Sequence, residues 1–60
     1  MAETLMQRMV RVRKEKKLTL FEMAIRTRIP EATISRLEKG AAQLTQQQAD
    51  IIRAFLSGKL

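Results

Sequence analysis

The chain has 60 residues, contains neither cysteine nor histidine, and carries 12 Lys and Arg against 6 Asp and Glu, a net charge of +6. The missing residue types exclude disulfides, zinc fingers and nearly all acid–base chemistry near neutral pH. The charge excess predicts a polyanionic partner, most simply nucleic acid, while a basic surface that only keeps the protein soluble is the plainer alternative.

The first predicted helix covers roughly residues 4–17. Its apolar residues Leu5, Met9 and Val12 recur at helical spacing. Basic residues fill much of the remainder, and those near the C-terminal end suit the helix dipole. We therefore expect the apolar residues of this helix to face a core.

Thr19 opens the second predicted helix, which covers about residues 20–27. Glu22 stands three residues later, and this spacing is that of a capping box. Pro30 then disfavours the α region for Ile29, so the helix is expected to end before that residue.

The third predicted helix covers about residues 31–39 and follows Pro30. Proline suits a helix entry because its missing N–H would have no partner there. Ile34 and Leu37 form the apolar stripe. Gly40 supplies the left-handed residue that ends the helix.

The fourth predicted helix starts at Thr45, which Gln48 can cap in return, and covers about residues 46–57. Four helices with short connections and no strand signal predict one small all-α domain over residues 1–60. Its expected core consists of Leu5, Met9, Val12, Leu18, Met23, Ala24, Ile29, Ile34, Leu37, Leu44, Ala49, Ile52 and Leu56.

The segment TLFEMAIRTRIPEATISRLEKG, residues 19–40, combines a short helix, a tight turn and a second short helix. That pattern is a helix-turn-helix unit, here over about residues 20–39. The segment resembles the helix-turn-helix of the lambda-repressor-like family of Cro and Xre-type regulators, and the resemblance covers about residues 5–56. The matching positions are Met23-Ala24, Ile29, Ile34-Ser35-Arg36, Glu38 and Gly40. The resemblance implies sequence-specific binding of double-stranded DNA, usually as a dimer on a two-fold symmetric operator.

The chain departs from the family pattern in two places. The family usually has glycine in the turn, where this chain has Arg28. A non-glycine residue in the left-handed region costs roughly 1–2 kcal/mol, so either the turn is reshaped or the strain is tolerated. The family domain also usually has a fifth helix, and with the sequence ending at Leu60 we expect none here.

The start of the third helix is expected to enter the major groove as a recognition helix. Arg36 is the best candidate for a bidentate contact to guanine, worth about 1–3 kcal/mol of discrimination. Ala32 and Thr33 can offer methyl contacts to thymine, and Ser35 can bond a base edge or a phosphate. Glu31 can accept from cytosine N4, or it stabilises only the helix N-terminus.

The predicted phosphate contacts flank that helix. Thr19 and the amides at the start of the second helix are candidates because helix N-termini bind anions. The resemblance implies that Lys17, Lys39 and the amides after Gly40 lie near the same DNA backbone. Arg28 is a further candidate.

Arg13 and Glu38 are expected to serve structure more than DNA recognition. In the family, the matching arginine of the first helix often pairs with the acid near the end of the recognition helix. We therefore predict that these two side chains form an ion pair, which fixes geometry more surely than it adds stability.

Further apolar residues lie beside the predicted core positions, in pairs four residues apart. The pairs are Met6 with Val10, Phe21 with Ile25, and Ile51 with Phe55. Either they complete the core in place of a fifth helix, or they form an interface. We expect a homodimer with Ile51, Phe55 and Leu56 of the fourth helix at its centre, which sets two recognition helices roughly 34 Å apart.

These features predict a small transcriptional regulator, most simply a repressor of the phage, plasmid or mobile-element type that occupies a promoter. The alternative is a protein-binding adaptor, such as the antitoxin of a toxin–antitoxin pair, whose exposed apolar helix faces hold a partner. A basic amphipathic peptide on a membrane surface fits the first helix alone. With no nucleophile–base pair, ligand cluster or phosphate loop, we expect no enzyme activity, metal, cofactor or small-molecule substrate.

A cytoplasmic location is expected for such a regulator. No apolar run approaches the roughly 20 residues that a membrane-spanning helix needs. The first ten residues, MAETLMQRMV, also lack the apolar region of a signal peptide.

Overall fold

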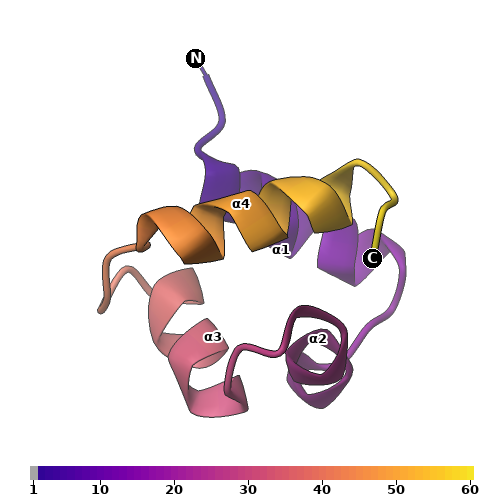
Figure 1. The fold of residues 1–60 in the computed structure, drawn as a ribbon, viewed down its shortest axis with the longest axis horizontal. Helices are drawn as coiled ribbons and strands as arrows, with labels where there is room; N and C mark the ends of the chain where they lie inside the picture. The colour runs from indigo at the N-terminus through magenta and orange to yellow at the C-terminus, as the bar shows by residue number, and fades with distance from the viewer. Residues whose placement is uncertain (1) are drawn as a thin grey trace.

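The computed structural model describes residues 2–60. Its helices are α1 (Leu5–Glu15), α2 (Leu20–Thr27), α3 (Glu31–Glu38) and α4 (Gln46–Leu56), and residues 2–60 contain no strand. This arrangement confirms the predicted small all-α domain. Figure 1 shows α4 lying across α1, with α2 and α3 together on the other side of the molecule. Further contacts between α1 and α3, and between α4 and α2, close the helices around one core.

Both predicted capping boxes are present. Thr19 Oγ1 accepts from the backbone N–H of Glu22 at 3.1 Å, and Glu22 Oε1 accepts from the backbone N–H of Thr19 at 2.9 Å. Thr45 and Gln48 form the same reciprocal pair at the start of α4. Each box satisfies two of the donors that a helix N-terminus otherwise leaves without a partner.

The ends of α1 differ from the prediction. Thr4 precedes the helix as its N-cap and forms a third capping box with Gln7, at 2.9 and 3.0 Å. The Thr-x-x-Gln spacing was available in the sequence as the signal for this start. At the other end, Lys17 lies outside the helix because its backbone turns into the left-handed region, with φ 57°.

The core follows the predicted apolar positions closely. The buried positions among them are Met9, Met23, Ile29, Ile34, Leu37, Ala49 and Ile52. The remaining ones are half-buried against this cluster: Leu5, Val12, Leu18, Ala24, Leu44 and Leu56. The helical spacing of apolar residues therefore identified the inner side of α1, α2 and α3, and most of it in α4.

Phe55 belongs to this core, which corrects its assignment to a dimer interface. Its side chain is only 4% exposed and lies in the same cluster as Ile52. Ala49, Ile52 and Phe55 recur every three residues, so one stripe of α4 carries them all into the interior. Ile51 and Leu56, the other two predicted interface residues, are half-buried.

The turn between α2 and α3 is left-handed at Arg28, the position where the sequence has arginine and not glycine. Arg28 has φ 58° and ψ 24°, so the strain is tolerated and the turn is not reshaped. Its backbone N–H donates to the carbonyl of Ala24 at 2.8 Å, which closes the last turn of α2.

Thr27 stabilises the same turn from inside, and the sequence analysis did not identify it. Its side chain is 3% exposed. Thr27 Oγ1 donates to the carbonyl of Met23 at 2.7 Å and accepts from the backbone N–H of Ile29 at 3.3 Å. The buried hydroxyl therefore satisfies a buried amide where the chain leaves the helix.

We predict that Arg28→Gly raises the free energy of unfolding by about 1 kcal/mol, because glycine has no Cβ to strain the left-handed conformation. Part of that gain is offset by the greater freedom of glycine in the unfolded chain. The matched control is Arg26→Gly, at an exposed helical position two residues earlier, which should lower the same quantity by about 1 kcal/mol. Urea unfolding followed by circular dichroism measures both, and a loss of equal size at the two positions contradicts the strain at Arg28.

Candidate nucleic-acid interface

The outer face of α3 carries Ala32 and Arg36. Ile34 and Leu37 enter the core at 1% and 4% exposure, which turns the opposite side of this helix outward. Ala32 and Arg36 are both exposed, and side chains four residues apart are neighbours along a helix. The two residues therefore share the solvent face of α3.

The other predicted base-reading residues surround this pair. Thr33 and Ser35 are half-buried on the flanks of the exposed face, and Glu31 is exposed in the first turn. A carboxylate at that position also interacts favourably with the helix dipole. The exposed face of α3 is thus built from small side chains and one long cation.

Arg36 and Lys39 are free of ion pairs with other residues in the described range 2–60. By contrast, Arg11, Arg13 and Arg53 each lie within 4.0 Å of a carboxylate oxygen. The five N–H donors of the Arg36 guanidinium are therefore not engaged by an acid of its own chain. Their fork geometry matches planar acceptors such as the O6 and N7 edge of guanine.

The N-terminus of α3 differs from the other three because Pro30 offers no side-chain cap. Pro30 accepts from Ile34 N–H through its carbonyl, whereas the amides of residues 31–33 find no acceptor within residues 2–60. Free first-turn amides carry the positive end of the helix dipole and are suited to a phosphate oxygen or to water.

The predicted phosphate-binding residues are all exposed: Lys17, Thr19, Arg28, Lys39 and Gly40. They come from the three loops that surround α2 and α3. Left-handed backbone recurs among them, since Lys17, Arg28 and Gly40 have φ of 57°, 58° and 74°. A side chain at Gly40 would meet no heavy atom within 4 Å, so only its backbone conformation calls for glycine.

Two backbone donors proposed for phosphate binding are already used inside the chain. The Thr19 N–H donates to Glu22, and the Ala41 N–H donates to the carbonyl of Arg36 at 2.8 Å. The hydrogen bonds from Thr19, its backbone N–H first and its side chain second, lower the pKa of the Glu22 carboxyl below its usual 4.5. Glu22 is therefore ionised at neutral pH and opposes a phosphate bound beside Thr19.

Arg13 and Glu38 form the predicted pair, and it is bidentate. Arg13 Nε and Nη2 donate to the two carboxylate oxygens of Glu38 at 2.8 and 3.0 Å. Arg13 Nη1 also donates to the carbonyl of Leu18 at 2.9 Å. Both charged side chains are only 14% exposed. The pair therefore ties α1 and the loop before α2 to the last turn of α3.

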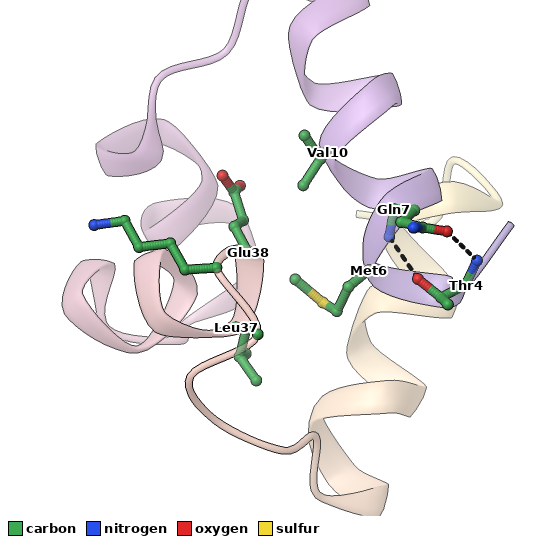
Figure 2. Close-up of a pocket in the computed structure, with 8 residues that line it drawn as sticks. Thr4, Met6, Gln7, Val10, Leu37 and Glu38 are labelled. Carbon is green, nitrogen blue, oxygen red and sulfur yellow. Dashed lines mark hydrogen bonds between the residues drawn. The ribbon is translucent and has the colours of Figure 1, made fainter.

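A groove of about 450 Å³ runs between the start of α1 and the end of α3. Figure 2 shows Met6 and Val10 of α1 pointing across it towards the end of α3, where Leu37 and Glu38 lie. Lys39 and Gly40 line its rim, whereas none of the predicted base-reading residues do. The groove is therefore separate from the exposed face of α3.

Among residues 2–60, no three Asp or Glu side chains gather where they could hold a metal ion. Nor does the described part of the chain include a helix of the length and apolarity that crossing a membrane requires.

Comparison of the chain with protein-family models, with curated proteins and with solved structures finds no match. The resemblance to the lambda-repressor-like family therefore stays an interpretation of the sequence. The geometry adds two facts that bear on it. The helices α2 and α3 meet through a tight left-handed turn, and α3 presents small side chains and an unpaired arginine to solvent.

Proposed function

We propose that this chain is a sequence-specific regulator of transcription that binds double-stranded DNA, acting as a cytoplasmic homodimeric repressor that occupies a promoter. The observation that carries the proposal is the exposed face of α3, where Arg36 stands beside small side chains and pairs with no acid in residues 2–60. An exposed cation with no acid partner binds an anionic ligand without first giving up an ion pair.

The small side chains on this face suit an approach to the major groove. B-DNA admits a helix into a groove about 12 Å wide, and small residues such as Ala32, Thr33 and Ser35 let the helix backbone approach the bases. The net charge of +6 supplies the attraction to phosphate that precedes base recognition. The bidentate Arg13–Glu38 pair holds α3 against α1, so the helix enters the groove as part of a rigid unit.

Because Phe55 is buried, the proposed dimer contact no longer includes it. The contact now consists of the half-buried Ile51 and Leu56, together with Leu60, which is 48% exposed. The domain measures 26 × 22 × 19 Å, so two copies in contact can hold their α3 helices one DNA turn apart, roughly 34 Å. A two-fold pair of this kind calls for a palindromic operator.

The experiment is selection of bound DNA from a randomised duplex library, followed by binding of the winning site at two salt concentrations. The proposal expects palindromic sites that bind at least about 10³-fold more tightly than random DNA. Unselective binding that disappears as salt is added contradicts it, because the basic surface is then only an electrostatic attractant.

On the selected site, Arg36→Ala should cost about 1–3 kcal/mol and relax the preference at one base position only. Lys39→Ala should weaken all sequences alike and reduce the slope of log affinity against log salt by about 0.9. The control is Arg53→Ala on α4, where an exposed arginine pairs with Asp50, and it should change neither quantity. Fluorescence anisotropy on the winning site and on single-base variants measures all three, and an unchanged preference in Arg36→Ala excludes base recognition by Arg36.

A further inference from the structure

Two large apolar side chains stand in solvent on α2. Phe21 and Ile25 are each 62% exposed, whereas most other large apolar side chains of residues 2–60 are buried or half-buried. Met23 and Thr27 on the opposite side of the helix are 0% and 3% exposed, so they form the side of α2 that packs in the core. Phe21 and Ile25, here called the α2 ridge, are therefore not needed to complete the core.

The charges around the α2 ridge are mostly positive. Lys17, Arg26 and Arg28 are exposed, and none forms an ion pair with another of residues 2–60. The acid of α2 is Glu22, whose Oε1 accepts the backbone N–H of Thr19. A partner that covers the α2 ridge therefore meets cations at both ends of this helix.

We propose that the α2 ridge binds an acidic amphipathic helix of a partner protein. Phe21 and Ile25 are one helical turn apart, about 6 Å along the axis, so they form a short straight stripe. An apolar stripe at the same spacing on a second helix packs against it, as ridges and grooves of paired helices do. Asp and Glu beside that stripe pair with Lys17, Arg26 and Arg28.

A second copy of this chain is a poor occupant. Two copies joined through their α2 ridges bring Arg26 and Arg28 of one towards the same cations of the other, and each chain already carries +6.

Single-stranded nucleic acid is also disfavoured at this position. Such ligands stack successive bases on several aromatic rings along a groove. The α2 ridge has one ring, its neighbour Ile25 is branched and aliphatic, and both lie on a convex helix surface. The base-reading candidates Ala32 and Arg36 lie on α3, outside the α2 ridge. Lys17 and Arg28 are shared with the proposed phosphate contacts, so a bound acidic helix competes with DNA for these two cations.

The test uses a synthetic peptide of about 20 residues, long enough to form a helix, with a leucine stripe and glutamate flanks. A matched peptide carries lysine in place of every glutamate. We expect the glutamate peptide to bind at least about tenfold more tightly than the lysine peptide. The double variant Phe21→Ser/Ile25→Ser should weaken its binding at least about tenfold, as expected when two buried apolar side chains are lost.

The controls separate this proposal from its competitors. Leu60→Ser removes an exposed apolar side chain outside α2 and should leave peptide binding unchanged, as should Arg36→Ala. Because Phe21 and Ile25 are exposed, the double variant should keep its circular dichroism spectrum and unfolding midpoint. If that folded variant still binds the peptide, or both peptides bind alike, the proposal is wrong.

Two other results would assign a different partner to the α2 ridge. Sedimentation equilibrium that shows a dimer dissolved by Phe21→Ser/Ile25→Ser identifies a second copy on the α2 ridge. Binding of a single-stranded oligonucleotide that the same variant abolishes identifies nucleic acid. Either result overturns the assignment to an acidic helix, and neither bears on whether α3 reads duplex DNA.

Discussion

Removing either member of the Arg13–Glu38 pair is expected to lower the free energy of unfolding by about 3 kcal/mol, because the remaining charge stays largely buried without its partner. Both side chains are 14% exposed, and the carboxylate receives two hydrogen bonds from one guanidinium. A domain of 60 residues has a total stability of roughly 3–9 kcal/mol. The loss of this one pair therefore removes at least about a third of the stability of the domain.

The measurement is urea unfolding of Arg13→Met, Glu38→Gln and the double variant Arg13→Met/Glu38→Leu. In the double variant no buried charge is left over, so it should recover much of the loss suffered by each single variant. The matched control is Arg11→Met, whose bonds to Glu3 and Glu15 lie at the surface and should contribute at most about 1 kcal/mol. Equal small losses at Arg11 and Arg13 contradict the structural role of the buried pair.

The Arg13–Glu38 pair also connects stability to the proposed DNA contact. It spans 25 residues of sequence and fixes the last turn of α3 to α1. A variant that keeps its fold but lets α3 move should bind all DNA sequences less tightly, because every base contact depends on the position of that helix. The folded double variant is the protein on which this effect is observable.

Local signals in the sequence sufficed for the helix starts. A capping box needs only a hydroxyl and a carboxyl or amide side chain three residues apart, so Thr19 with Glu22 and Thr45 with Gln48 were recognisable without any tertiary contact. The left-handed Arg28 was less certain, since sequence allowed either a strained or a reshaped turn. The choice depends on packing, where Thr27 anchors the turn to the core.

The side of α4 that is buried could not be decided in the same way. Ile51, Ile52, Phe55 and Leu56 span an arc of about 140° on one side of that helix, which is wider than a single buried stripe, so periodicity alone left the inner stripe ambiguous. Contacts with α1 and α2 select Ile52 and Phe55 for the interior. The exposed face of α3 was predictable because only Ile34 and Leu37 compete for its inner side. The backbone N–H groups near α3 that remain free could be identified only from the structure.

Phe55→Ala is expected to lower the free energy of unfolding by about 3–5 kcal/mol, the loss typical of a large aromatic side chain removed from a packed core. That loss is a large share of the roughly 3–9 kcal/mol expected for a domain of this length, so the variant should unfold at a markedly lower temperature. The matched control is Phe21→Ala, the same substitution at a side chain that is 62% exposed, which should change stability by about 0.5 kcal/mol or less.

Protein concentration separates the core role of Phe55 from an interface role. A core residue loses the same free energy at every concentration, whereas a dimer contact contributes only where the dimer is populated. Thermal unfolding of Phe55→Ala and of the unmodified chain should therefore be compared across a hundredfold range of concentration, roughly the range over which a dimer equilibrium shifts visibly. If the difference in unfolding temperature between the two proteins grows with concentration, Phe55 lies in an interface. If the difference is constant, the proposed contact between two copies consists of Ile51 and Leu56 of α4 and the exposed Leu60 that follows it.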